Sequence, residues 1–276
     1  MKYIVENFES IDHLLKSNEV RSPNVVFAGR DHSSETGTED FTGTESYKEA
    51  VGLFRFGYSK PLEKIKRGVE VNAMGLKKHN TTPRLGIVGF TPCVPNAILG
   101  LPNSMVNIEM EPKKSKIVSI VYDSCANCMT SEGTFIAAGI AVLTIVNSLE
   151  IQGYRVSLRV GFYNSKADKQ AVYSTVKLKD WRQPLDIKKM AFPFCHPSML
   201  RRIGFKWLET QPELTDTDFR GGYGSSLPNV KTYDEMRTYL KENKMIANDE
   251  KYINIPLCSS KDYDPQKIAK ACDLEI

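Results

Sequence analysis

The sequence predicts an α/β fold, with a mainly parallel sheet and helices on both faces, preceded by a helical and irregular N-terminal region. From residue 116 onward, apolar runs of strand length alternate with longer segments of helical periodicity. Parallel strands need crossover connections, and the helical segments are long enough to supply them. The chain has 276 residues, 41% of them hydrophobic and 25% charged. This length can bury a substantial core, and this composition excludes wholesale disorder.

Residues 1–84 carry helical and irregular patterns rather than strand patterns. We expect a short amphipathic helix at 8–17 and a polar loop at 30–40. Two further helices are expected at 44–57 and 61–74, where apolar residues recur at helical spacing. These elements predict an N-terminal region that is separate from the sheet.

The α/β domain is expected to span residues 85–276. Strands are predicted at 85–90, 105–110, 116–123, 154–162, 171–180 and 252–257. Helices are predicted at 130–152, 185–210, 233–243 and 265–272. Pro193 and Pro197 are expected to break the helix at 185–210. We expect 105–110 to pair with 116–123 as a hairpin and 171–180 to be an edge strand.

The lack of a signal-peptide pattern and of an apolar stretch of membrane-span length favours a soluble, cytoplasmic protein. Thirty-seven basic and thirty-three acidic residues leave a net charge of +4, which is too mild to indicate a nucleic-acid partner. The N-terminus shows no apolar segment of signal-peptide type. The most apolar stretch, 135–149, is shorter than the ~20 residues of a membrane span, so we expect a buried helix and no membrane partner. Without an export signal, the six cysteines are expected to be reduced.

The candidate site is the loop DSCANCMTSEG, which follows the predicted strand at 116–123. Ligands of open α/β sheets bind beyond the carboxyl ends of the strands. The residues expected to bind a partner lie in this loop and in a glycine-rich segment at 220–226: Asp123, Ser124, Cys125, Asn127, Thr130, Glu132, Arg220 and Tyr223. Asp123 has a second interpretation, as a helix cap or as a hydrogen-bond acceptor that closes the loop. Thr130 and Glu132 can also be interpreted as first-turn residues that complement the helix dipole.

The stretch KIVSIVYDSCANCMTSEG and the helix and strand after it resemble the opening of a von Willebrand factor A-like (vWA-like) domain. The resemblance covers residues 113–210 and is greatest to the bacterial form in cobaltochelatase-type subunits. It implies a vWA/Rossmann-like sheet and a metal loop of the pattern Asp-x-Ser-x-Ser. Asp123 matches the Asp, Cys125 and Asn127 occupy the serine positions, and Ser124 is shifted by one place. The resemblance thus implies a degenerate Mg²⁺ site at Asp123, Ser124 and Asn127, although cysteine is a poor ligand for a hard cation.

A second resemblance concerns three segments: residues 41–65, 91–105 and 196–209. They are similar to an uncharacterised protein type that is common in tailed bacteriophages. Together the resemblances imply a phage-encoded, non-catalytic protein-interaction module in the host cytoplasm, with a MoxR-type AAA+ ATPase as a partner. Two alternatives stay open: a phage protein that blocks a host factor or binds a virion component, and an enzyme that uses Cys125 or a metal at Asp123.

Other chemistry-bearing residues have weaker patterns. Cys125 and Cys128 form a single CxxC, whereas structural zinc needs four ligands. Cys125 could act as a nucleophile with His196 as its base, but His196 is as readily explained by a local backbone hydrogen bond. The sequence contains neither GxxxxGK[ST] nor GxGxxG, so it shows no nucleotide-hydrolysing motif.

Three basic residues, Arg201, Arg202 and Lys206, recur at helical spacing near Trp207. Such a stripe could meet phosphate or an acidic partner. More often it is the solvated face of a helix, which is what we expect here.

Overall fold

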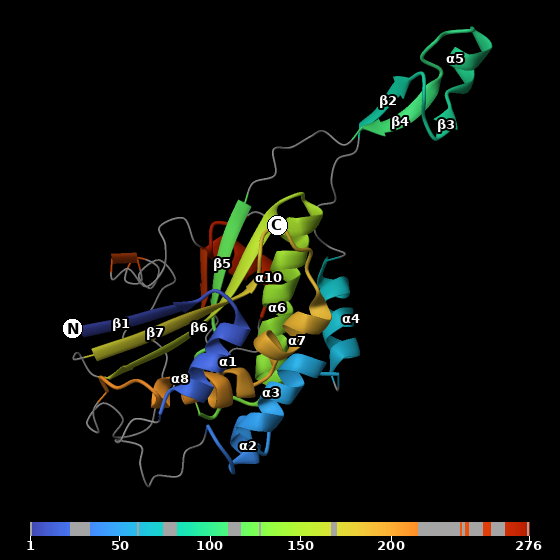
Figure 1. Ribbon diagram of the computed structural model, residues 1–276. Coiled ribbons are helices and arrows are strands. Elements are labelled where there is room, and N and C mark those ends of the chain that lie inside the picture. Colours follow the sequence, from blue (N-terminus) through green and yellow to red (C-terminus); the bar gives the residue numbers. More distant parts are fainter. Residues whose placement is uncertain are drawn as a thin grey trace.

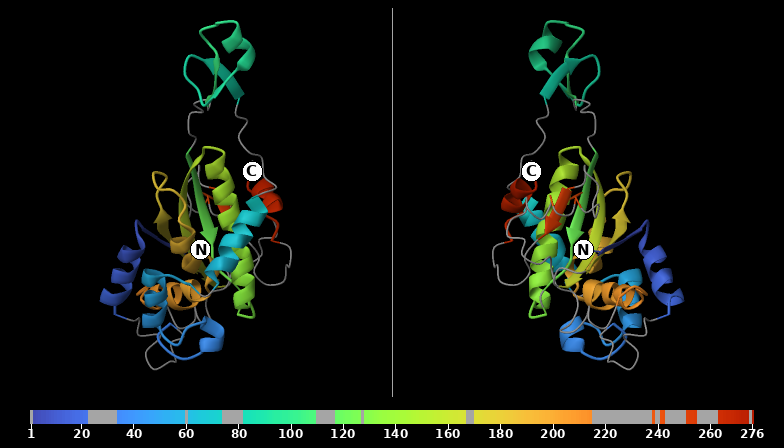
Figure 2. Two further views of the ribbon diagram at one scale, coloured as in Figure 1. Left: turned by 90° about the vertical axis from the view of Figure 1, so that its right-hand side faces the viewer. Right: turned by 90° about the vertical axis from the view of Figure 1, so that its left-hand side faces the viewer.

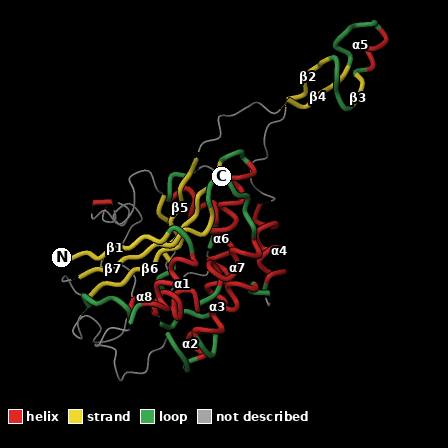
Figure 3. The backbone as a smooth tube through the Cα atoms, in the orientation of Figure 1, coloured by secondary structure: helices red, strands yellow, loops and turns green. Residues whose placement is uncertain are grey.

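The computed structural model describes residues 2–22, 34–59, 61–73, 82–109, 117–126, 128–166, 170–214, 238, 241–242, 251–254, 263–274 and 276. Its main body is a five-stranded sheet packed against helices. A small three-stranded antiparallel sheet stands apart from this body (Figures 1, 2 and 3).

The main sheet has the strand order β1-β7-β6-β5-β8. Its strands are β1 (Lys2–Phe8), β5 (Ile117–Asp123), β6 (Arg155–Lys166), β7 (Gln170–Lys179) and β8 (Lys251–Asn254). β5 pairs in parallel with both β6 and β8, and β1 pairs in parallel with β7, whereas β6 and β7 are antiparallel. The expected α/β fold with a mainly parallel sheet is therefore confirmed.

Except for α2, which falls at the end of the expected polar loop, the helices lie close to their predicted positions, with ends shifted by a few residues. They are α1 (Ile11–Val20), α2 (Glu39–Thr42), α3 (Tyr47–Phe56), α4 (Leu62–Ala73), α6 (Glu132–Ile151), α7 (Ile187–Cys195), α8 (Phe205–Glu209) and α10 (Pro265–Ala271). A π-helical turn, η2 (Met199–Gly204), joins α7 to α8. Pro193 lies inside α7 and does not break it; the helix ends at Cys195, before Pro197. Of the helix expected at 233–243, only residues 238, 241 and 242 are described, and these are helical.

Helix α6 is the centre of the core. Its apolar residues occur on every side, and it packs against α4, α7, α10 and β6. It is long and apolar enough to cross a membrane, but 67% of that stretch is buried inside the fold. The expectation of a buried helix is therefore confirmed, because neighbouring elements cover it on several sides.

The two faces of the main sheet have different neighbours among the described residues. On one face, Tyr122 stacks on Phe194 of α7 with 5.4 Å between ring centroids, and Phe8 meets His13 of α1 at 5.2 Å. Helices α1, α6, α7 and α8 cover this face (Figure 1). The opposite face carries the polar residues Asp123, Arg159, Thr175 and Lys177 together with the fully buried Val121 and Tyr173. The expected helical cover on both faces is not seen in the described part of the chain.

The N-terminal segment contributes a strand to the main sheet, which the helical and irregular patterns of residues 1–84 did not predict. Residues 2–8 form β1, which pairs with β7 from Lys2 opposite Gln170 to Phe8 opposite Val176. β7 therefore lies between β1 and β6, and the expectation of an edge strand at 171–180 is wrong. The physical reason is the burial of Phe8, which has no exposed surface and joins the core formed by the other strands.

The small sheet is built from residues 82–109 and has the strand order β2-β4-β3. It consists of β2 (Thr82–Gly86), β3 (Thr91–Pro92), α5 (Val94–Ile98) and β4 (Met105–Glu109). β4 pairs with β2 and β3, so the expected hairpin between 105–110 and 116–123 is wrong. The chain bends at residues 87–90, where a Cβ on Gly89 would lie 2.2 Å from the carbonyl oxygen of Val106. Only glycine, which has no Cβ, allows the backbone of Val106 to come this close. The bend at 87–90 interrupts the strand that was expected at 85–90.

Candidate functional site

The loop that follows β5 is tied to the sheet from its first residue. The Asp123 side chain is fully buried, and its Oδ1 accepts a hydrogen bond from the Cys125 backbone N–H at 2.9 Å. The backbone N–H and the hydroxyl of Ser124 both donate to the Gly161 carbonyl of β6, at 3.0 and 2.9 Å. Asp123 thus acts as a loop-closing acceptor, which is the second interpretation offered by the sequence.

Most of the predicted partner-binding residues in this loop are buried. Asp123, Ser124, Cys125 and Thr130 were expected to bind a partner, but they are at most 5% exposed, so their side chains do not form a surface that a partner can reach. The Ser124 hydroxyl is turned toward β6 by its hydrogen bond to Gly161, and the Asp123 carboxylate is turned inward by its bond to the Cys125 N–H. Glu132 is exposed, as expected. The remaining predicted residues, Asn127, Arg220 and Tyr223, lie outside the described residues.

The described side chains of the metal loop do not fit Mg²⁺. One carboxylate oxygen of Asp123 accepts a backbone N–H, and the Ser124 hydroxyl donates to a carbonyl. The buried Cys125 thiol offers a soft ligand where the metal would require oxygen. No group of three His, Cys, Asp or Glu side chains suited to a metal occurs among the described residues.

Two exposed side chains stand at the outer end of the loop. Cys128 is exposed, and Met129 is 87% exposed. Directly after them the chain turns inward: Thr130 is buried, and the Ser131 hydroxyl caps α6 by accepting the Thr134 N–H at 3.3 Å. The loop therefore presents a soft, apolar tip on an immobilised base.

Arg201 of η2 holds the backbone of this tip. Its guanidinium donates to the carbonyls of Thr130 at 3.0 Å and Cys128 at 3.4 Å, and to the carbonyl of Phe41. The same group lies 4.1 Å from the ring centroid of Phe41 and 5.1 Å from that of Phe135. Burial lowers the pKa of Arg201 to about 10. The expectation of a solvated basic stripe is wrong for this residue, because backbone carbonyls supply the hydrogen bonds that water would otherwise make.

Arg202 holds the segment at 37–44 in the same way. It is fully buried and donates to the carbonyls of Gly37, at 2.6 Å, and Thr44, and to the Thr44 hydroxyl at 3.3 Å. The Thr44 and Ser198 hydroxyls are 2.9 Å apart, and Ser198 donates to the Thr42 carbonyl at 2.6 Å. Sequence reasoning missed Thr44 and Ser198. The sequence feature that could have revealed this network is the pair of arginines inside an otherwise apolar run. Arginines in such a position are buried only when they are hydrogen-bonded.

His196 closes the network on the side of α7. Its Nδ1 accepts the Ser198 N–H at 3.1 Å, and its ring packs edge-on against Tyr58 at 4.6 Å and stacks on Phe192 at 5.1 Å. Burial lowers the pKa of His196 to about 4, with the Glu132 charge acting in the opposite direction. Tyr58 in turn donates its hydroxyl hydrogen bond to Glu132. The local backbone role that the sequence offered for His196 is confirmed.

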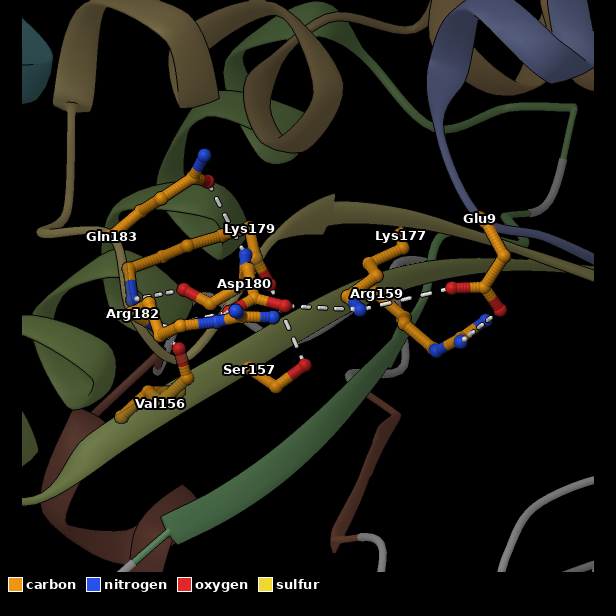
Figure 4. Close-up of polar contacts among 9 residues, drawn as sticks. All are labelled: Glu9, Val156, Ser157, Arg159, Lys177, Lys179, Asp180, Arg182 and Gln183. Atoms are coloured by element: carbon orange, nitrogen blue, oxygen red, sulfur yellow. Dashed lines mark hydrogen bonds and ion pairs between the residues drawn. The ribbon is translucent and has the colours of Figure 1, made fainter.

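The sheet face that carries Arg159 and Lys177 has a second cluster of charged side chains (Figure 4). Arg159 pairs with Glu9 at 3.1 Å, and Lys177 pairs with Asp180 at 3.1 Å and Glu9 at 3.7 Å. Acidic partners neutralise both cations. We therefore assign this cluster to holding β6, β7 and the end of β1 together rather than to binding a ligand.

Comparison with known proteins places the chain in one family. No curated protein and no solved structure matches it. A family model described as "Domain of unknown function (DUF7192)" matches residues 2–274, from β1 to the end of the α10 region. The match spans the N-terminal strand, the small sheet and the main body alike. The chain belongs to the DUF7192 family.

Proposed function

We propose that this protein is a phage-encoded, non-catalytic protein-binding module of the vWA-like type, which uses the tip of the loop between β5 and α6. The observation that carries the proposal is the contrast within this loop. Its base is buried and hydrogen-bonded, while Met129 is 87% exposed. A flexible thioether on a rigid, otherwise polar support is typical of a surface that packs against another protein.

The order of strands around the loop supports the vWA-like assignment. β5 has β6 on one side, after the crossover through α6, and β8 on the other. The loop therefore leaves the sheet at a point where the strand order reverses direction, which is where such sheets bind ligands. The arrangement departs from the expected order in one respect, since β1 lies beyond β7.

The surroundings of the tip favour a partner with both basic and apolar groups. Phe41 and Thr130 accept hydrogen bonds from the same guanidinium, so the 39–45 segment lies beside the tip. This segment exposes Glu39, Asp40 and Glu45. An acidic rim beside an exposed methionine matches a basic surface with an apolar pocket. The partner suggested by the resemblance is a MoxR-type AAA+ ATPase. In the cytoplasm the thiols of the described cysteines would stay reduced.

The test compares two lysine substitutions on the segment that runs from this loop through α6. Met129→Lys places a like charge against the basic partner, whereas Ile151→Lys changes a 46% exposed residue at the opposite end of α6. We expect Met129→Lys to weaken binding of a purified MoxR-type ATPase from the same genome about tenfold or more, as measured by calorimetry. Ile151→Lys should bind like the unmodified protein.

A photo-crosslinker attached to the exposed Cys128 gives a second readout, and it should form an adduct with the ATPase. If both variants bind the ATPase equally, the proposed surface is rejected. If the unmodified protein does not bind the ATPase, the proposed partner is rejected.

A further inference from the structure

The small sheet at 82–109 exposes a large amount of apolar surface. Eight of the fourteen exposed large hydrophobic residues in the described chain lie within it, and they are between 46% and 80% exposed. They are Leu85, Ile87, Val88, Phe90, Val94, Ile98, Leu99 and Leu101. The sheet stands apart from the main body in every view (Figures 1 and 2), so the main body does not cover them.

This unit has no core of its own. No side chain described between residues 83 and 107 is buried. Backbone hydrogen bonds hold its shape, such as Phe90 N–H to the Val106 carbonyl at 3.0 Å and Cys93 N–H to the Ser104 carbonyl at 2.7 Å. Because a small antiparallel sheet needs a covered apolar face to be stable, the unit requires another apolar surface against it.

The exposed area matches what one partner contributes to a stable interface. At roughly 100 Å² for each of these side chains, the unit presents on the order of 800 Å² of apolar surface. One copy of this unit therefore supplies about half of a standard two-sided contact.

The absence of charge indicates which partner fits. Between Arg84 and Glu109 the sequence contains no Asp, Glu, Lys, Arg or His. A partner that is recognised by opposite charge would find no ionic group on this surface. Because the surface is uncharged, two copies of it do not repel each other electrostatically. The outer strands β2 and β3 are also edges that can lie against another copy.

We propose that residues 82–109 form a homodimer contact, in which the apolar surfaces of two copies pack face to face about a two-fold axis. Self-complementary contacts of this kind are the commonest in soluble oligomers. This surface is separate from the loop at Met129, so the dimer can form whether or not that loop binds a partner.

The oligomeric state of the full chain tests the proposal directly. Sedimentation velocity from roughly 1 to 100 μM should show a reversible dimer. Ile87→Lys combined with Ile98→Lys places like charges across the contact and should raise the dimer dissociation constant about 100-fold or more. Ile151→Lys, on α6, is the matched control and should sediment like the unmodified chain.

A second variant guards against misfolding of the substituted unit. Thr82 and Glu109 are register partners in the β2–β4 pair, so the ends of the unit lie side by side. Replacing 83–108 with a short Gly-Ser turn therefore spans the gap, and the core residues of the main body lie outside this range. The excised protein should keep its thermal transition and sediment as a monomer.

Two outcomes would overturn the proposal. One is a full-length chain that stays monomeric up to the highest concentration. This outcome includes a monomeric chain that binds anionic lipid vesicles in a flotation assay. The other is a dimer that persists in both the double-lysine and the excised variants, since its contact would then lie elsewhere.

Discussion

At the scale of single residues, burial decides the chemistry of this protein. Arg201, Arg202 and His196 are polar groups within an apolar run, and each is hydrogen-bonded to backbone atoms. A buried guanidinium without such partners would cost several kcal/mol, so these hydrogen bonds account for the presence of the residues. Their effect is to join the 37–44 segment and the tip of the β5–α6 loop to η2.

The burial of His196 predicts a pH dependence of stability. Its pKa falls from 6.5 in the unfolded chain to about 4 in the folded one. Between these values the unfolded chain binds a proton that the folded chain does not, so the free energy of unfolding falls as the pH drops from 6.5 toward 4. The loss from this group is up to about 3 kcal/mol.

The measurement is urea unfolding of the unmodified protein and His196→Asn at several pH values between 4 and 7.5. Asparagine keeps an acceptor for the Ser198 N–H but cannot be protonated, so its stability should depend less on pH. His13→Asn, at an exposed histidine, serves as the control. A pH dependence that is the same in all three proteins would contradict the assignment.

At the scale of elements, α6 and α7 pack closely against each other. A Cβ on Gly139 would lie 2.4 Å from the Cys195 Sγ and 2.5 Å from the Phe194 carbonyl oxygen. The small residue lets the two helices approach, and this brings α7 and its histidine to the end of the sheet where the loop lies. Gly133, in the first turn of the same helix, is exposed and has no such neighbour.

Alanine substitutions at the two glycines should therefore have opposite signs. Gly139→Ala should lower the free energy of unfolding by about 1–3 kcal/mol, because the added methyl group overlaps backbone and sulfur atoms. Gly133→Ala should raise it by about 0.5–1 kcal/mol, because alanine favours the helix. Chemical denaturation of the two variants checks both values, and an equal effect at both positions would argue against the tight α6–α7 contact.

At the scale of the whole molecule, β1 ties the start of the chain to the main sheet. Glu6 accepts hydrogen bonds from Trp207 of α8, at 2.7 Å, and from Arg21. Burial by itself raises the pKa of Glu6, but these hydrogen bonds outweigh it and the pKa is lowered. The N-terminal strand, α1 and α8 thus form one cooperative unit with the sheet.

A substitution in β1 should accordingly destabilise the entire body. Phe8→Ala removes a fully buried ring and should cost about 3 kcal/mol in a single unfolding transition. Val20→Ala, at a residue that is 74% exposed, should change the stability little. Calorimetry that shows two transitions, with only one shifted by Phe8→Ala, would support a separate N-terminal region instead.

Much of the fold was predictable because its signals are local. The apolar run of β5, the continuous apolar composition of α6 and the Asp264 cap of α10 occur within neighbouring residues. The candidate loop was likewise placed at the end of β5 on strand order alone. The exposure of its side chains was not predictable, because Asp123 and Ser124 are turned inward by hydrogen bonds to Cys125 and Gly161.

The sequence by itself determined the alternation of strands and helices, the buried central helix and the position of the loop, since hydrophobic periodicity and chain polarity act over short distances. Only the tertiary structure decided that β1 completes the sheet, that Arg201 and Arg202 are buried, and that residues 82–109 form a separate apolar unit. Each of these depends on the register or proximity of segments far apart in the chain. Such contacts are set by the packing of the whole molecule, and no local pattern specifies them.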